Sequence, residues 1–325
     1  MHGRLELQSI IVPLLAIAIG PIVALLTGDV YVLHVYERAL IFAVAAASLN
    51  LILGFGGMVS FGHAVFIGLG AYVTGIMSNA DITALWFQVP AILAVTGIVA
   101  LVMGLIALRT TGVYFIMITL ALAQIFYYTA VSTSTFGGDD GLVIYERSTF
   151  FGFYDPWDSW QFYGFIATVS LGLIWFITAV INSDFGLRLL ATRENPQRSG
   201  ALGMHVLGTR LLAFVIAGMV CGLAGMLLAN QSEFATPGYA NWQRSGELLA
   251  IVILGGVGLR MGPVYGAFAF ILVEHTLAAY TSHWAFYFGP VLVLVVLFLN
   301  RGLGGLVDRI LHTRSTTLPE FEEAR

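Results

Sequence analysis

The chain is dominated by apolar runs that are long enough to cross a lipid bilayer. Turn and charge signals divide it into ten such runs, at residues 8–27, 37–54, 57–78, 87–108, 112–131, 162–182, 210–229, 245–259, 262–281 and 285–300. A spanning helix needs about 20 residues, and most of these runs approach that length. Only 10% of the residues are charged, against roughly 25% in soluble proteins. The sequence predicts an all-α, polytopic transmembrane bundle of about 10 spans, forming one domain over residues 1–325.

Glycine and proline interrupt the third run and the junction of the eighth and ninth. Gly255, Gly256 and Gly258 precede the pair Gly262-Pro263 at that junction, and both residue types break helices where the backbone lines a cavity. Eight spans with one re-entrant element are therefore the alternative.

Arginine placement predicts the orientation of the bundle. With both termini in the cytoplasm, eleven of the fourteen arginines fall at cytoplasmic ends, while Arg38, Arg147 and Arg244 fall at or near the outer face. This distribution follows the positive-inside rule. It places a periplasmic loop at 132–161, a polar loop at 183–210 and a C-terminal tail at 301–325, the last two in the cytoplasm.

The segment from Leu49 to Gly75 combines bilayer-compatible hydrophobicity with seven glycines and several polar side chains. Glycine weakens a helix but permits close helix approach and backbone breaks beside a polar path. Either close packing or a transport pathway explains the glycines. The candidate pathway residues are Asn50, Ser60, Phe61, Gly62 and His63. For Asn50, Ser60 and His63, a hydrogen bond between packed helices is the competing interpretation.

Several chemistries are excluded by composition. All fourteen basic residues are arginine, so the chain lacks the lysine of a Walker A loop and the lysine of a Schiff base. The single cysteine, Cys221, permits neither an internal disulfide nor a thiolate metal site. The histidines show no metal-ligand spacing, and no nucleophile–base set is present. We expect a transporter rather than an enzyme, with no cofactor of its own.

Two polar segments interrupt the apolar runs. The outer segment carries Asp139 and Asp140, which indicate either a solvated turn or a docking point for a partner on the outer face. It also carries an aromatic run that we expect at headgroup level. The inner segment mixes apolar patches with arginines, and Pro196 can start a short helix there. It is either an ordinary positive-inside loop or an amphipathic surface for a partner. Within the ninth run, we expect Glu274 and His275 to neutralise each other.

These segments, taken in order, resemble the permease subunits of bacterial branched-chain amino acid ABC importers, of the LivM type within the LivH/LivM family. The motifs that carry the resemblance cover about residues 37–305: Leu49-Asn50-Leu51, Val59 to Ala64, Gly68 to Tyr72, Gly137 to Leu142, Arg193-Glu194-Asn195, Ala201-Leu202-Gly203, Leu211 to Ile216, Gly222 to Gly225 and Gly262 to Ala267. Each is weak alone, whereas their order and spacing are specific.

The resemblance implies a permease of the bacterial inner membrane that imports branched-chain or related amino acids. It implies two cytoplasmic ATPase subunits that use the ATP, a second, unlike permease of the LivH type, and a periplasmic solute-binding protein, with lipid around the bundle and no nucleic acid. The coupling loop at 183–210 would contact an ATPase through Arg193, Glu194, Asn195, Leu202 and Gly203. After Asn195 the chain departs from the family pattern, with Pro196, Gln197, Arg198 and Ser199 in place of acidic and alanine residues.

Two alternatives stay open at this point. Urea and short-chain amide permeases resemble the same family, and the pathway candidates do not separate them from amino acid permeases. A self-sufficient channel or secondary transporter is the rival from another class. It would need a coupling-ion site, for which Glu274 is the buried carboxylate that the sequence offers.

Overall fold

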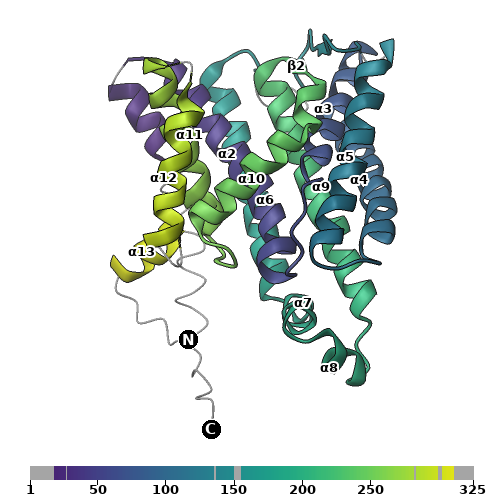
Figure 1. Ribbon diagram of the computed structural model, residues 1–325. Coiled ribbons are helices and arrows are strands. Elements are labelled where there is room, and N and C mark those ends of the chain that lie inside the picture. Colours follow the sequence, from purple (N-terminus) through teal and green to yellow (C-terminus); the bar gives the residue numbers. More distant parts are fainter. Residues whose placement is uncertain are drawn as a thin grey trace.

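The computed structural model describes residues 18–26, 28–134, 137–149, 155–281, 283–298 and 302–310. Nearly all of this part is helical (Figure 1). After a helix over 18–26, the elements are α2 (Tyr31–Asn50), the π-helical turn η1 (Leu51–Phe55), α3 (Ala64–Asn79), α4 (Leu85–Ala107), α5 (Val113–Ser132), β1 (Leu142–Val143), α6 (Ser159–Asn182), α7 (Asp184–Glu194), α8 (Pro196–Ala201), α9 (Val206–Ser232), β2 (Phe234–Ala235), the 3-10 helix η3 (Pro237–Ala240), α10 (Trp242–Gly255), α11 (Gly262–Tyr280), α12 (Trp284–Phe298) and α13 (Gly302–Ile310).

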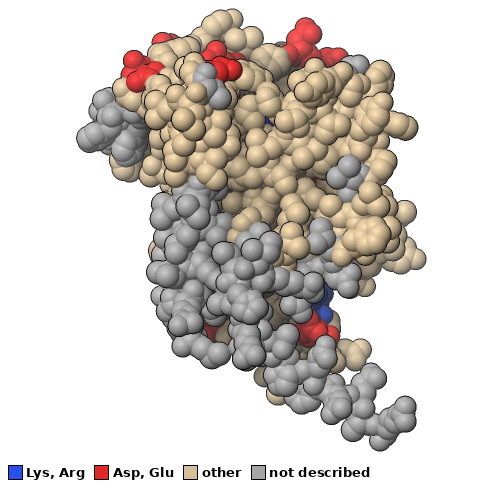
Figure 2. Space-filling model, turned by 90° about the vertical axis from the view of Figure 1, so that its left-hand side faces the viewer, with Lys and Arg blue, Asp and Glu red and all other residues tan. Residues whose placement is uncertain are grey.

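The predicted polytopic helical bundle is confirmed. Within the described residues, six helices are long and apolar enough to cross a membrane: Tyr31–Phe55, Leu85–Ala107, Val113–Ser132, Ser159–Asn182, Val206–Ser232 and Gly262–Tyr280. Two shorter apolar helices accompany them. Figure 2 shows acidic residues along the upper rim of one face and an uncharged belt beneath them, as a bilayer requires.

Two predicted runs have different boundaries in the structure. The glycine-rich run at 57–78 is helical only in part, because residues 56–63 are non-helical and α3 starts at Ala64. Near the start of this segment, Gly57 has a φ of +68°, which residues other than glycine rarely adopt. The run at 245–259 forms α10, which begins earlier, at Trp242, and ends at Gly255. With 16 and 14 residues, α3 and α10 are too short for ordinary spans.

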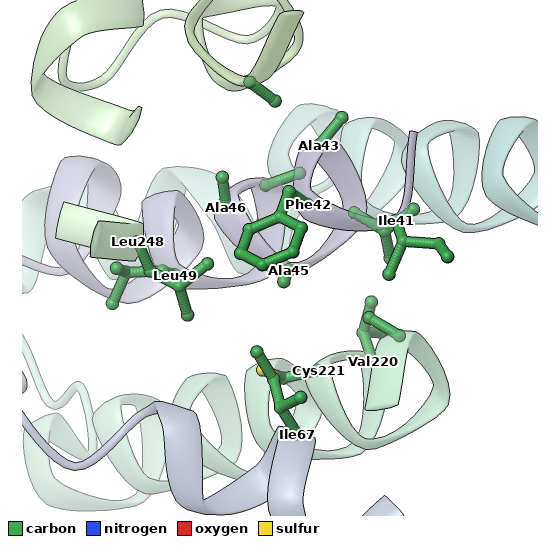
Figure 3. Close-up of a cluster of buried hydrophobic side chains, with 14 of the residues drawn as sticks. Ile41, Phe42, Ala43, Ala45, Ala46, Leu49, Ile67, Val220, Cys221 and Leu248 are labelled. Carbon is green, nitrogen blue, oxygen red and sulfur yellow. The ribbon is translucent and has the colours of Figure 1, made fainter. Parts of the chain in front are cut away.

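Helix α2 forms the centre of the bundle, where it packs against α6, α9, α10 and α11. Its small residues between Phe42 and Leu49 let the neighbouring helices approach closely, and nearly all of these residues are fully buried. Figure 3 shows this cluster, in which Phe42 and Leu49 of α2 lie near Leu248 of α10 and Cys221 of α9. The buried polar groups described below are therefore held in a rigid apolar frame.

Glycine determines how closely α3 approaches α9, the most extensive helix pair in the bundle. A Cβ atom added at Gly70 would lie 2.8 Å from the carbonyl carbon of Gly222 and 3.1 Å from its Cα. Similarly, a Cβ at Gly218 would lie 2.9 Å from the Cβ of Ala100 on α4. At Gly70 backbone therefore packs on backbone, and at Gly218 on a small side chain, as expected for small-residue interfaces in membranes.

The two ends of the bundle differ in structure. At one end, β1 and β2 pair antiparallel, with Leu142 opposite Ala235; we call this the β end. The segment after β1 is tied down there, because Arg147 donates to Glu233 at 2.6 Å and Ser148 N donates to Asn230 Oδ1 at 2.7 Å. Helices α7 and α8 lie at the opposite end, which we call the α7–α8 end (Figure 1).

The predicted aromatic run in the outer segment is described only in part. Phe150, Phe151, Phe153 and Tyr154 lie outside the described residues. Trp157 and Trp160 are 58% and 41% exposed at the β end. Their position fits the interfacial preference of tryptophan.

Candidate functional site

The N-termini of the two short helices, α3 and α10, meet inside the bundle. The backbone N–H of Ala64, at the start of α3, donates to Ser245 Oγ in the first turn of α10 at 3.0 Å. Just before α3, Phe61 N donates to Thr119 Oγ1 of α5 at 3.2 Å, and Gly62 N donates to Ser60 Oγ at 3.2 Å. The first N–H groups of a helix have no partner within it. Side chains of the bundle supply the partners here, so the helix break is stabilised by hydrogen bonds.

Gly62 lets the non-helical segment press against α5. A Cβ at this position would collide with the carbonyl oxygen of Thr119 and lie 3.2 Å from its carbonyl carbon. The same atom would lie 3.2 Å from Met103 Cε on α4. Any larger residue would push the segment away from α5 and remove its bond to Thr119.

His63 is the last residue of the non-helical segment, and its ring is fully buried. Its Nε2 lies 2.9 Å from Ser48 Oγ on α2, and Ser48 Oγ donates to Ala45 O at 2.7 Å. A hydroxyl has a single hydrogen, so His63 Nε2 carries the proton shared with Ser48. Nδ1 has no hydrogen-bond partner among the described residues. This is the geometry of a hydrogen bond between packed helices.

The other expected pathway residues lie at different places around the same break. Ser60 is fully buried, whereas the Phe61 side chain is partly exposed. Asn50 is the last residue of α2. Its Nδ2 donates to Leu259 O and its Oδ1 accepts from Gly258 N, both at 2.9 Å. Asn50 thus fastens the end of α2 to the turn between α10 and α11.

Two ion pairs flank Phe42 on α2. Arg38 donates to Glu274 Oε1 at 2.9 Å, and Arg244 donates to Glu247 Oε2 at 2.6 Å. Both guanidinium groups lie over the Phe42 ring, 5.6 and 5.5 Å from its centroid, a distance at which a cation is attracted by the ring. The spacing of Arg244 and Glu247 signals their pairing in the sequence, whereas nothing there signals that Arg38 and Glu274 meet.

The expected pairing of Glu274 with His275 is wrong. Adjacent residues on a helix point in different directions, so Glu274 turns toward Arg38. His275 lies instead against Tyr31, with ring centroids 5.7 Å apart. A coupling-ion site at Glu274 would first have to displace the Arg38 guanidinium.

At the α7–α8 end, the predicted short helix beginning at Pro196 is confirmed. Asn195 caps it by accepting from Arg198 N at 2.9 Å, as expected for an N-cap asparagine. Glu194 is the last residue of α7 and is exposed. Leu202 follows α8 and is 73% exposed, and Gly203 adopts a φ of +84°.

Arg193 behaves differently from its neighbours on this surface. Its side chain turns inward, and Nη1 donates to the carbonyl oxygen of Gly54 in η1. The Arg193 side chain is nevertheless 41% exposed. Arg193 therefore turns toward η1, whereas Leu202 points to solvent.

Asp139 and Asp140 lie together in an exposed turn at the β end. The turn needs glycine, because Gly137, Gly138 and Gly141 have φ values of +79°, +59° and +77°. Neither aspartate contributes to a metal-binding group, and no cluster of three potential ligands occurs within the described ranges.

Comparison with known proteins assigns the chain to a family. A family model described as "Branched-chain amino acid transport system / permease component" matches residues 31–299. The chain is 24% identical to the high-affinity branched-chain amino acid transport system permease protein LivM of Salmonella typhimurium, and the alignment covers 81% of this chain and 68% of the relative. LivM of Escherichia coli gives the same identity and coverage.

A second group of relatives is named for the import of a different solute. The chain is 25% identical to the autoinducer 2 import system permease protein LsrC of Yersinia pseudotuberculosis, over 91% of this chain and 76% of the relative. No solved structure matches the chain. Since the family model spans most of the helical bundle described above, the chain belongs to the family of branched-chain amino acid transport system permease components, which are multi-pass membrane subunits of ABC importers and not enzymes.

Proposed function

We propose that the chain is a permease subunit that imports branched-chain or related amino acids across the bacterial inner membrane. The observation that carries the proposal is the pair of short helices whose N-termini meet inside a bundle of this family. In transporters, interrupted helices of this kind point their N-terminal dipoles at the solute path. Two ATPases, a second permease of the LivH type and a periplasmic binding protein complete the importer.

The solute path, on this proposal, runs along the break. Among the pathway candidates in the non-helical segment, Phe61 has a side chain that reaches the surface, whereas Ser60, Gly62 and His63 are buried. The face of α10 beside it adds polar and aromatic side chains, with Trp242 45% exposed and Gln243 also exposed. The second permease would provide the opposite wall.

The α7–α8 end faces the cytoplasm and docks an ATPase, on the same proposal. Exposed leucines support this role, since Leu187, Leu190 and Leu202 are 64%, 36% and 73% exposed on a surface outside the apolar belt. Exposed apolar patches of this kind often mark protein interfaces. Glu194, Asn195 and Gly203 would shape the contact around Leu202. Both termini would then lie in the cytoplasm and the β end in the periplasm, where Asp139 and Asp140 would meet the binding protein.

The docking role predicts the effect of a charge at Leu202. Leu202→Asp removes apolar area and introduces a carboxylate into the interface, which should weaken ATPase binding by about tenfold or more. Leu202→Met keeps an apolar side chain of similar size and is the matched control. Co-purification of the ATPase with each variant from membranes measures the effect. Equal recovery with both variants would contradict docking at this position.

Solute identity is tested by uptake in cells that carry the complete importer and in a strain with this chain deleted. The proposal predicts that labelled leucine uptake depends on the chain. Labelled urea and labelled autoinducer 2 are the competing solutes, suggested by the alternative resemblance and by the LsrC relatives. Chain-dependent uptake of either competitor without leucine uptake would refute the proposed substrate.

A further inference from the structure

Arg193 joins α7 to the end of α2. Its Nη1 donates to the carbonyl oxygen of Gly54 in η1. Its aliphatic stem lies against Gly57, where an added Cβ would be 2.9 Å from Arg193 Cγ. The carbonyl groups at the C-terminal end of a helix carry partial negative charge and attract a guanidinium. Arg193 therefore holds the end of α7 against the turn from which the non-helical segment departs.

The same turn is fastened to the loop between α10 and α11. Asn50 forms two hydrogen bonds to this loop, one accepting from Gly258 N and one donating to Leu259 O. A Cβ at Gly258 would lie 4.0 Å from Arg193 Nη1 and 3.5 Å from Gly54 O. Three segments that are far apart in the sequence thus meet at one point: the end of α7, η1 and the α10–α11 loop.

Two of these three segments, η1 and the α10–α11 loop, lead directly to a short helix. From η1 the chain passes through residues 56–63 to the N-terminus of α3, and the α10–α11 loop begins where α10 ends. The two short helices also touch at Ala64 and Ser245. A displacement of α7 acting through Arg193 would therefore reach both sides of the break.

We infer that Arg193 is a positioning residue that makes the end of α7, η1 and the α10–α11 loop move as one unit, so that a displacement of α7 is passed to both short helices. The inference rests on the proposed function, in which an ATPase moves α7. It assigns Arg193 an inward role distinct from docking, because its guanidinium contacts this chain's own backbone.

The first test replaces the guanidinium. Arg193→Gln removes the charge-assisted bond to Gly54 and should lower the solute transported per ATP hydrolysed by about tenfold in a complex that still assembles. Arg193→Lys keeps a cation and should retain part of the coupling. Arg109→Gln, an exposed arginine in the α4–α5 loop, is the control and should match the unmodified chain. Normal coupling in Arg193→Gln would overturn the inference.

The second test restores the link covalently. A Cβ at Gly57 would lie 3.7 Å from Arg193 Cβ, within the roughly 3.5–4.5 Å that a disulfide spans. Gly57→Cys and Arg193→Cys, combined in a Cys221→Ala chain, should be uncoupled when reduced and coupled again when oxidised. Gly57→Cys alone measures the strain of a side chain at a φ of +68°.

The outcomes separate this inference from the proposed function. If the oxidised chain assembles with the ATPases yet stays uncoupled, α7 and η1 must move relative to each other, and the rigid link is wrong. If the unmodified complex itself shows no ATP-dependent uptake, the proposed function fails instead.

Discussion

The close contact of α3 with α9 predicts opposite effects for two alanine substitutions on the same helix. A Cβ at Gly70 would collide with the Gly222 carbonyl oxygen and lie 2.8 Å from the carbonyl carbon, so the helices must separate by more than about 0.7 Å to reach normal contacts. At Gly75 the nearest atom would be Ala235 Cβ at 3.5 Å, which is an ordinary contact. Both positions are buried, so exposure does not distinguish them.

The magnitudes follow from two competing terms. Replacing glycine by alanine within a helix stabilises it by up to about 1 kcal/mol, and this gain applies at both sites. Overpacking costs about 1–3 kcal/mol and applies only to Gly70, where backbone atoms cannot rotate away. We expect Gly70→Ala to destabilise the protein by about 1–2 kcal/mol and Gly75→Ala to be neutral or stabilising by up to about 1 kcal/mol.

Thermal unfolding of the purified chain in one detergent, followed by far-UV circular dichroism, measures this contrast. A difference of about 2 kcal/mol corresponds to roughly 4–8 °C in apparent Tm on the scale of larger soluble domains. Gly75→Ala serves as the internal control for the effect of alanine itself. An apparent Tm of Gly70→Ala that equals or exceeds that of Gly75→Ala would refute backbone contact between α3 and α9.

Two further predictions concern polar contacts. Asn50→Ala removes both hydrogen bonds to the α10–α11 loop and should lower the free energy of unfolding by about 1–2 kcal/mol. The lower value is expected because hydrogen bonds in membrane proteins average about 0.6 kcal/mol each. An unchanged Tm would contradict the link. Glu274→Gln leaves Arg38 without its carboxylate and should cost about 1 kcal/mol. The double variant with Arg38→Gln should recover part of that loss, and strictly additive losses would show that the pair does not interact.

The bundle was predictable from the sequence because hydrophobic length is a local property. Each apolar run fixes its own tendency to cross the membrane, and the glycines around Gly57 and Gly256 signal where helices are interrupted. Local glycine content does not say which half of a run stays helical. The helical start at Ala64 depends on backbone N–H groups that donate to Thr119 and Ser245, which lie on other helices.

The placement of the polar side chains could not be predicted in the same way. His63 was as compatible with a cavity as with a packed interface, and Ser48 settles its position by a contact between α2 and the break. Arg193 reaches Gly54 across 139 positions of sequence, and Arg38 reaches Glu274 across 236. Such pairs arise from the way helices are arranged in space, about which a single sequence carries little information.

The central claim is that this chain conducts solute only as part of an ATP-driven complex. The direct measurement is uptake of labelled leucine into proteoliposomes that contain the two permeases, with the ATPases and the binding protein present or omitted. We predict uptake when ATP and all subunits are present, and none when either the ATPases or ATP is left out. Leucine accumulation by the reconstituted chain without ATPases would contradict the claim.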